Sequence, residues 1–465
     1  MRSRRPIVRH GGFGIAAATV LAAGAATALA IPASGIPAAT GTAGQAAGAR
    51  TVAAADVAAP VIRLVPMIRV PSPRPRSRPS GGYTPAQIRG AYHLRPLTRA
   101  GINGTGESIV IVDSFGSPTI GHDLRVFDRR FGLPAPWLKI IHPAGRIPRF
   151  KQTGNRINWA YETTLDVEWA HAMAPRARIV LAETPVSENE GRSGFPQIET
   201  AEKYVLAHRL GGVISQSFGA TEETFPKGTI RPLRGAYLEA ARKANRVTVV
   251  SASGDFGATD YHNGLKTFYT KRVTSWPASD PLVTAVGGTN VVLTAKGRRA
   301  RPDQVWNDPG FPSASGGGKS VIFGRPPYQN KYAAKTGKHR GVPDISMSAS
   351  CSHPVDIYES FSGRGWKVIC GTSEATPLFA GVIALADQLA GHWLGAINAD
   401  LYRLAAQSKS GIVDVTRGNN TVHFRQHGKA YTVRGWKAVR GYDLASGLGT
   451  VNASIFVRKL AAMAR

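Results

Sequence analysis

Five short apolar runs, rich in β-branched residues, constrain the fold of this chain more than any other feature. They are ESIVIVDSFG (107–116), ARIVLAET (177–184), GGVISQSFG (211–219), RVTVVSASGD (246–255) and LVTAVGGT (282–289). Amphipathic helical patterns at 159–174 and 234–245 lie between them. Uninterrupted apolar strands are typical of a parallel sheet that is buried on both faces. The sequence therefore predicts an α/β fold with a mostly parallel central sheet and helices on both faces.

The first 82 residues differ in composition from the rest of the chain. Arginines crowd the first nine residues, and an apolar run at 13–30 follows and ends in Ala-Leu-Ala. This pattern is typical of a cleaved secretory signal peptide; an uncleaved membrane anchor is the alternative. Residues 31–82 are rich in Pro, Arg, Ala and Gly, which indicates an extended linker. We expect a signal peptide at 1–30, a linker at 31–82, one folded domain at 83–465, and a secreted, extracellular protein.

The charge is strongly basic, with 58 Lys and Arg against 29 Asp and Glu and a formal net charge of +29. Such a balance invites the hypothesis of a nucleic-acid binder. Ten of the arginines lie within residues 1–82, however, and no recognised nucleic-acid motif is present. We therefore expect no nucleic-acid partner. The two cysteines exclude a disulfide-dense scaffold and a four-cysteine zinc site.

The most specific local motif is CGTSEATPLFAGVIALADQ at 370–388, in which Ser373 opens a long apolar helix. A serine at a helix N-terminus gains from the helix dipole and from free backbone N–H groups, which also suit a developing oxyanion. The simpler interpretation is a plain serine N-cap. A nucleophilic serine would also need a base.

The helix predicted at 159–174 carries two carboxyl groups that could act as that base. Glu162 and Asp166 are four residues apart, so they share one helix face, about 5–6 Å apart at Cβ. Two carboxylates this close repel each other, so the pKa of one carboxyl group rises. The raised pKa prepares the pair for proton transfer under acidic conditions. The alternative is a solvated helix face with no chemical role.

Taken together, these motifs resemble the sedolisin family of serine-carboxyl peptidases in the subtilisin-like clan, from Tyr83 to the C-terminus. Ser373 matches the family's nucleophile, Glu162 and Asp166 its E-x-x-x-D helix, and Asp255 in SASGDFG its oxyanion aspartate. The segments YTPAQIRGAYHL (83–94), SQSFGATE (215–222), SGGGKS (315–320) and RGVPDIS (340–346) also fit the pattern.

Two residues fall outside that set. Asp113 resembles the aspartate strand of subtilisins, but no histidine lies in the segment that would complete their triad. His171 follows the carboxyl pair on the same predicted helix, and we expect it to be structural.

The resemblance implies a secreted endopeptidase that acts on polypeptides at acidic pH. Ser373 would attack the peptide carbonyl, Glu162 would move the proton, and Asp166 would orient Glu162. A protonated Asp255 would donate a hydrogen bond to the oxyanion. We expect a monomer with no stable membrane association after signal cleavage. The alternative is a catalytically silent relative that binds peptides or the cell wall.

The resemblance also implies one structural calcium ion near the C-terminus. By that match Asp414 and Asp443 would supply side chains, and Val415, Val439 and Gly441 would supply carbonyl oxygens. Val439 stands where the family usually has glycine. The alternative interpretation is a set of ordinary turn aspartates.

Three further features bear on maturation and on the site. In an exported protein Cys351 and Cys370 are expected to pair; two free buried thiols are the alternative. Family precursors usually carry a large folded prodomain, and residues 31–82 are too few and too Pro-rich to be one. Lys319 and Glu374 depart from the apolar and small residues that the family tends to have, which could alter substrate preference or local pKa values.

Overall fold

The computed structural model describes residues 65–66 and 81–463, except 153, 188–193, 263, 295–296, 310–311 and 364. The predicted signal peptide and most of the predicted linker lie outside these residues. The described residues belong to one compact unit, Ala58–Arg465. Among them, no helix is both long and apolar enough to cross a membrane.

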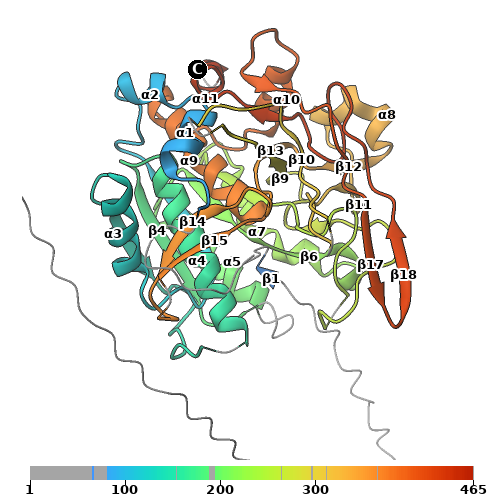
Figure 1. Ribbon diagram of the computed structural model, residues 1–465, viewed down its shortest axis with the longest axis horizontal. Coiled ribbons are helices and arrows are strands. Elements are labelled where there is room, and N and C mark those ends of the chain that lie inside the picture. Colours follow the sequence, from blue (N-terminus) through green and yellow to red (C-terminus); the bar gives the residue numbers. More distant parts are fainter. Residues whose placement is uncertain are drawn as a thin grey trace, which may run out of the picture. The chain divides into compact units, whose positions relative to one another are not determined.

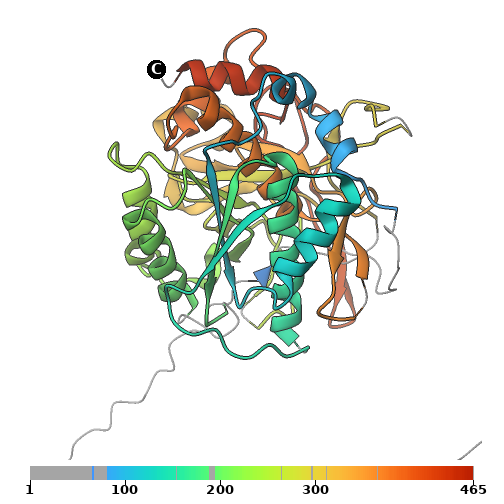
Figure 2. The ribbon, with the colours of Figure 1, turned by 90° about the vertical axis from the view of Figure 1, so that its left-hand side faces the viewer.

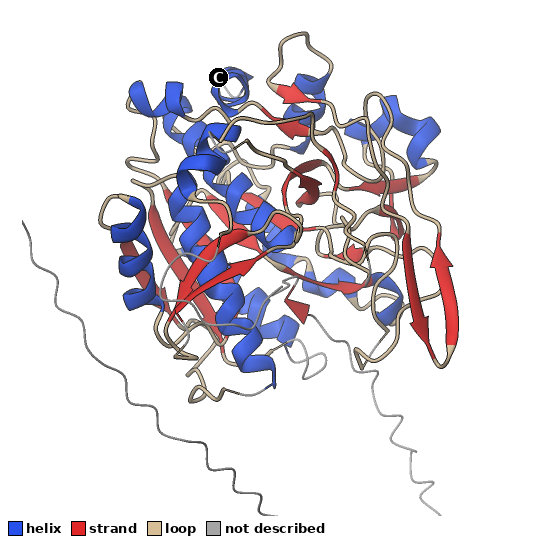
Figure 3. Ribbon diagram, in the orientation of Figure 1, coloured by secondary structure: helices blue, strands red, loops and turns tan. Residues whose placement is uncertain are grey.

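An eight-stranded sheet forms the centre of the fold (Figures 1 and 3), in the order β10-β9-β7-β5-β2-β4-β3, with β13 also paired to β9. All neighbours in it are parallel except β10 with β9. Its strands are β2 (Ser108–Ser114), β3 (Trp137–Ile141), β4 (Arg178–Thr184), β5 (Val213–Gln216), β7 (Thr248–Ala252), β9 (Thr284–Asn290), β10 (Gln304–Val305) and β13 (Ile345–Ser348). The predicted mostly parallel sheet is confirmed.

Helices cover both faces of this sheet, as the sequence predicts (Figure 2). Successive residues of β2 belong to different cores: Ile109 and Ile111 pack with one face, Val110 and Val112 with the other. The first core contains α4 (Gly154–Met173) and α9 (Thr372–Ala390), which pack against each other. The second contains α5 (Gly194–Ala207) and α7 (Gly235–Ala240).

The predicted run at 211–219 differs from the structure in one respect. It is interrupted at Ser217, after which β6 (Phe218–Thr221) leaves the central sheet. β6 pairs with β8 (Ser275–Trp276) and with β1 (Val65–Pro66) in a separate small antiparallel sheet. The apolar run therefore contains two strands with different partners.

Smaller elements surround the sheet. The helices are α1 (Pro85–Ala91), α2 (Arg95–Arg99), α3 (Ile120–Phe131), α6 (Ile230–Leu233), α8 (Ala333–Thr336), α10 (Asn398–Ala405) and α11 (Ala453–Met463), with 3-10 turns η2 (Glu222–Thr224) and η3 (Pro327–Tyr332). The strands form four two-stranded pairs: β11 (Gly318–Gly324) with β12 (His339–Val342), β14 (Val355–Glu359) with β15 (Gly365–Ile369), β16 (Ile412–Val413) with β19 (Thr450–Val451), and β17 (Val422–Gln426) with β18 (Lys429–Val433).

Candidate active site

Helix α4 places Glu162 and Asp166 inside the protein rather than on its surface. Every residue from Trp159 to Met173 is buried, and both carboxyl side chains are 0% exposed. The helix is enclosed because α9 lies along it on one side and strands of the central sheet on another. The interpretation of this pair as a solvated helix face is therefore wrong.

Helix α9 brings Ser373 to that carboxyl pair. Its N-cap is Gly371, with φ of 123°, so Ser373 is the second residue of the helix and not its N-cap. The Ser373 hydroxyl lowers the Glu162 pKa, although neither Glu162 oxygen has a protein partner at ordinary hydrogen-bond distance among the described residues. Catalytic hydrogen bonds are often long without substrate. The candidate nucleophile and the candidate base are neighbours on two packed helices.

Burial and mutual repulsion make the carboxyl groups hold their protons to unusually high pH. Burial raises the pKa of Glu162 well above its ordinary value, and the nearby Asp166 and Asp113 raise it further. Burial and Asp113 likewise raise the pKa of Asp166, while the Ser217 hydroxyl, which donates to its Oδ1 at 2.9 Å, opposes that rise. Burial raises the pKa of Asp113 to about 7. The site therefore contains three interacting carboxyls.

Asp255 lies just beyond the end of β7, against the first turn of α9. Its Oδ1 accepts hydrogen bonds from the Thr372 N–H and the Thr372 hydroxyl, each at 2.8 Å. The Gly254 N–H also donates to the Thr372 hydroxyl, at 3.2 Å. Since Thr372 precedes Ser373, these bonds hold the Asp255 carboxyl at the first turn of α9, where a donor could face a developing oxyanion.

The glycines at 316–318 include one that packs against the backbone leading into Asp255. The Gly316 N–H donates to the Gly254 carbonyl at 2.7 Å, and a Cβ at Gly316 would lie 2.2 Å from the Ser253 carbonyl oxygen. A residue with a side chain at this position would therefore displace the Ser253–Gly254 backbone that leads into Asp255. This close approach explains a glycine at that position of the SGGGKS motif.

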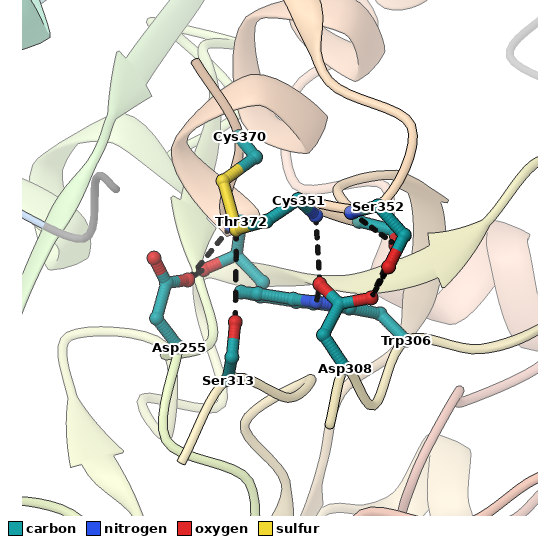
Figure 4. The surroundings of a disulfide bond; sticks show 9 residues. Asp255, Trp306, Asp308, Ser313, Cys351, Ser352, Cys370 and Thr372 are labelled. Atoms are coloured by element: carbon teal, nitrogen blue, oxygen red, sulfur yellow. Dashed lines mark hydrogen bonds between the residues drawn. A yellow bond between two sulfur atoms is a disulfide. The ribbon is translucent and has the colours of Figure 1, made fainter. Parts of the chain in front are cut away.

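A disulfide holds the segment that leads into α9 (Figure 4). Cys351 and Cys370 are bonded, so the expected pairing is confirmed. Asp308 organises the Cys351 side: it accepts hydrogen bonds from the Cys351 N–H at 2.8 Å, the Ser352 hydroxyl at 2.7 Å and the Trp306 indole at 2.6 Å. The bond ends three residues before Ser373 and so limits the freedom of the nucleophile.

The sequence did not assign two residues that the structure brings to the site. Asp113 was recognised as a strand aspartate, but its partner is the carboxyl pair of α4 instead of a histidine. Ser217 gave no separate signal, because its role depends on the break between β5 and β6. His171, which we expect to be structural, is buried: its Nε2 lies 3.2 Å from the Pro134 carbonyl oxygen and 3.4 Å from Asp128 Oδ1, and burial lowers its pKa to about 4.

The two halves of the predicted calcium site lie together. The Gly441 N–H donates to Asp414 at 2.8 Å, and the Val439 N–H donates to Asp443 at 3.0 Å. Neither carboxylate forms an ion pair with a cationic side chain of the described residues. Carboxylate oxygens that form no ion pair with Lys, Arg or His suit a hard cation such as Ca²⁺. The described residues contain no group of three or more His, Cys, Asp or Glu that could hold a metal, so carbonyl oxygens would have to complete the site.

Comparison with known proteins agrees with this geometry. The model of the subtilase family matches residues 154–426. Kumamolisin from Bacillus sp. (strain MN-32) is 32% identical over 387 residues, which is 81% of this chain and 63% of kumamolisin. Sedolisin from Pseudomonas sp. (strain 101) is 31% identical over 284 residues, or 60% of this chain and 45% of sedolisin. The chain thus spans less than two thirds of either relative.

A solved structure shares the fold. It is a complex of Pseudomonas sedolisin, a serine-carboxyl proteinase, with two molecules of pseudo-iodotyrostatin. Its chain is 26% identical in sequence to this one, and the two structures superpose with a TM-score of 0.68. The match covers 82% of this chain and 97% of that one. The chain therefore belongs to the subtilase family, and within it to the sedolisins.

Proposed function

We propose that this protein is a secreted serine-carboxyl peptidase that acts at acidic pH and hydrolyses polypeptides through an acyl-enzyme on Ser373. One observation carries the proposal. Ser373, Glu162 and Asp166 lie on two packed helices in a buried site, with Asp255 fixed at the first turn of the nucleophile helix. A catalytically silent relative would have no need to keep all four chemical groups in this arrangement.

The residues suggest a complete proton path. Ser373 Oγ attacks the substrate carbonyl carbon while its proton passes to Glu162, and a protonated Asp255 donates a hydrogen bond to the oxyanion. When the C–N bond breaks, Glu162 returns the proton to the leaving amine and the acyl group stays on Ser373. A water molecule then attacks the acyl carbon and gives one proton to Glu162. As the bond between Ser373 Oγ and the acyl carbon breaks, Glu162 passes that proton to Oγ, which releases the acid and restores the serine.

Acidic conditions suit this cycle for two reasons. Interacting carboxyls titrate as a group, so one can be ionised as the base while its neighbours hold protons. An aspartate can donate to the oxyanion only while it is protonated, and acid favours that form. Both conditions fail as the pH rises and the carboxyl groups of the site ionise together.

Secretion, the mode of cleavage, the oligomeric state and a bound calcium ion complete the proposal. The signal-peptide pattern supports secretion, and the resemblance supports endopeptidase action by a monomer on polypeptides. The carboxylates of Asp414 and Asp443, which accept hydrogen bonds from Gly441 and Val439 of one segment, support one structural calcium ion, with carbonyl oxygens of Val415, Val439 and Gly441 as further donors. Such an ion would hold the two segments together and would take no part in the reaction.

The test compares the purified protein with its Ser373→Ala and Glu162→Gln variants on a peptide library from pH 3 to pH 8. We expect cleavage that is greatest at acidic pH and lost in both variants. Cleavage at internal peptide bonds would support an endopeptidase. Release of tripeptides would instead indicate a tripeptidyl-peptidase. Equal behaviour of the protein and Ser373→Ala at every pH would refute the proposed activity.

A further inference from the structure

Two basic side chains share one half-buried tryptophan ring. The guanidinium carbon of Arg272 lies 4.4 Å from the centroid of the Trp436 ring, and the Lys319 Nζ lies 5.4 Å from it. Arg272 precedes β8, Lys319 belongs to β11 and Trp436 follows β18, so three separate segments meet here. The negative face of an aromatic ring attracts cations, so Trp436 holds both side chains in place. We call Arg272, Lys319 and Trp436 the basic platform.

The two cations of the basic platform lack a protein counter-charge. Within the described part of the chain, neither Arg272 nor Lys319 forms an ion pair. The turn η2, which packs against β11, carries two acidic residues that are engaged elsewhere. Glu222 is buried and accepts two hydrogen bonds from β11, each at 2.6 Å, and Glu223 forms an ion pair with Lys271. Two cations over one ring repel each other, so a bound anion would stabilise this arrangement.

Hydrogen bonds tie the platform to the segment beside Asp255. The Trp436 N–H donates to Asn420 Oδ1 at 2.7 Å, and the Asn420 amide donates to the Ser315 carbonyl at 3.1 Å. A Cβ at Gly318 would lie 3.3 Å from Trp436 Nε1. The same glycine segment packs against the backbone that leads into Asp255. The platform therefore borders the part of the candidate active site that carries the proposed oxyanion donor.

Arg272 connects the platform to the carboxyl side of the site. Two residues after it, the Thr274 carbonyl accepts a hydrogen bond from the Glu222 N–H at 2.9 Å, and β8 then pairs with β6. β6 begins after Ser217, whose hydroxyl donates to Asp166. An extended peptide spans about 3.3 Å per residue. A substrate residue a few positions from the scissile bond is therefore the part of a peptide that would meet the platform.

The chemistry of the platform suits a carboxylate. A guanidinium stacked on an aromatic ring keeps its N–H edge for the two oxygens of a carboxylate. The Lys319 ammonium adds a second positive charge beside it. Arg434 and Lys437, which flank Trp436 in the sequence, are exposed and add to the positive charge of this segment. In a peptide substrate the matching groups are the side chains of Asp and Glu.

We propose that Arg272 and Lys319, held on Trp436, bind an acidic side chain of the substrate and give the peptidase a preference for acidic peptides. This inference rests on the proposed peptidase function and names its substrate class. Free Asp and Glu side chains have pKa values of about 3.9 and 4.3. The preference therefore operates in mild acid, where the substrate carboxyl is ionised, and fades in stronger acid.

The test measures binding of short fluorescent peptides to proteins that carry Ser373→Ala, so that no peptide is cleaved. One peptide series carries a single Glu that is moved along the sequence, and a matched series carries Gln at the same positions. The variant is Arg272→Gln/Lys319→Met. The control is Arg458→Gln/Lys459→Met, which removes one exposed Arg and one exposed Lys from α11. Salt at about 0.15 M screens attraction that depends only on net charge.

Binding decides the inference independently of catalysis. At pH 5 we expect Glu to bind at least about fivefold more tightly than Gln at one or two positions, in both the parent and the control. This difference should be absent in the Arg272→Gln/Lys319→Met protein, and absent from every protein at pH 3. Equal affinity for Glu and Gln in the parent would overturn the inference. An equal gain at every position would also overturn it, because that result would reflect net charge alone.

Activity then tests the preference itself. With Ser373 present, kcat/KM for the best Glu peptide should exceed that for its Gln partner by at least about fivefold, and the platform variant should remove this ratio without changing kcat/KM for the Gln peptide. Ser373-dependent cleavage with no Glu preference would refute the acidic preference while leaving the proposed peptidase function in place. A lack of Ser373-dependent cleavage in all proteins would refute the peptidase function, and the binding result would still decide whether the platform takes a carboxylate.

Discussion

Replacement of Asp113 by asparagine should remove one defined share of the pH dependence of stability, to which other buried carboxyls such as Glu162 and Asp166 also contribute. Burial raises the pKa of Asp113 from 3.8 to about 7. The folded protein therefore keeps a proton on this group that the unfolded chain releases. That difference stabilises the fold at low pH and is lost as the pH rises through the folded pKa. Each pKa unit corresponds to about 1.4 kcal/mol, so about 4 kcal/mol of stability should disappear between pH 4 and pH 8.

Urea unfolding at pH 4, 6 and 8 measures this effect, on a Ser373→Ala background that prevents self-digestion. The asparagine side chain cannot ionise, so the Asp113→Asn variant should lose about 4 kcal/mol less than the parent over this range. Only this change with pH matters, because the substitution has its own constant cost. A control at Asp400, which forms a surface ion pair with Arg403, should leave the pH dependence unchanged. A difference under about 1 kcal/mol between parent and Asp113→Asn would refute the buried, proton-holding cluster.

Three further outcomes follow from the same structure. Replacing both Cys351 and Cys370 with serine should lower the free energy of unfolding by about 3 kcal/mol, since the bond joins residues 19 apart; unchanged urea midpoints would contradict this. Asp255→Ala should lower kcat about 10²–10³-fold with little change in KM, because it would remove the proposed oxyanion donor; a change confined to KM would instead indicate a binding role. Excess chelator should lower the Tm of the protein but not that of an Asp414→Ala variant, and equal shifts in both would argue against a calcium site there.

The sheet was predictable because buried parallel strands leave a strong local signal. The five apolar runs correspond to β2, β4, β5, β7 and β9. β3 was missed because it is an edge strand with an exposed Trp137, and so it lacks a continuous apolar run. The break at Ser217 was also missed, since apolar character alone does not show that β6 changes its pairing partners.

The candidate site was only partly predictable from local sequence. Spacing places Glu162 and Asp166 on one helix face, and that expectation holds. Spacing says nothing about what covers that face, however, and burial is what changes the chemistry of the pair. Asp113 joins the pair from β2, nearly fifty residues earlier, through tertiary packing alone. Long-range contacts of this kind have no periodic signature in a single sequence.

The basic composition and the acidic chemistry of the site are compatible because they are separated in space. The chain has 29 more basic than acidic residues, yet no ion pair among the described residues includes Asp113, Glu162 or Asp166. A neighbouring Lys or Arg would favour the ionised carboxylates and lower their pKa. Burial and repulsion instead keep the pKa of each carboxyl high. Exclusion of cationic side chains from the site is therefore as necessary to its chemistry as the carboxyls themselves, and a basic residue introduced beside Asp166 should shift the activity toward lower pH.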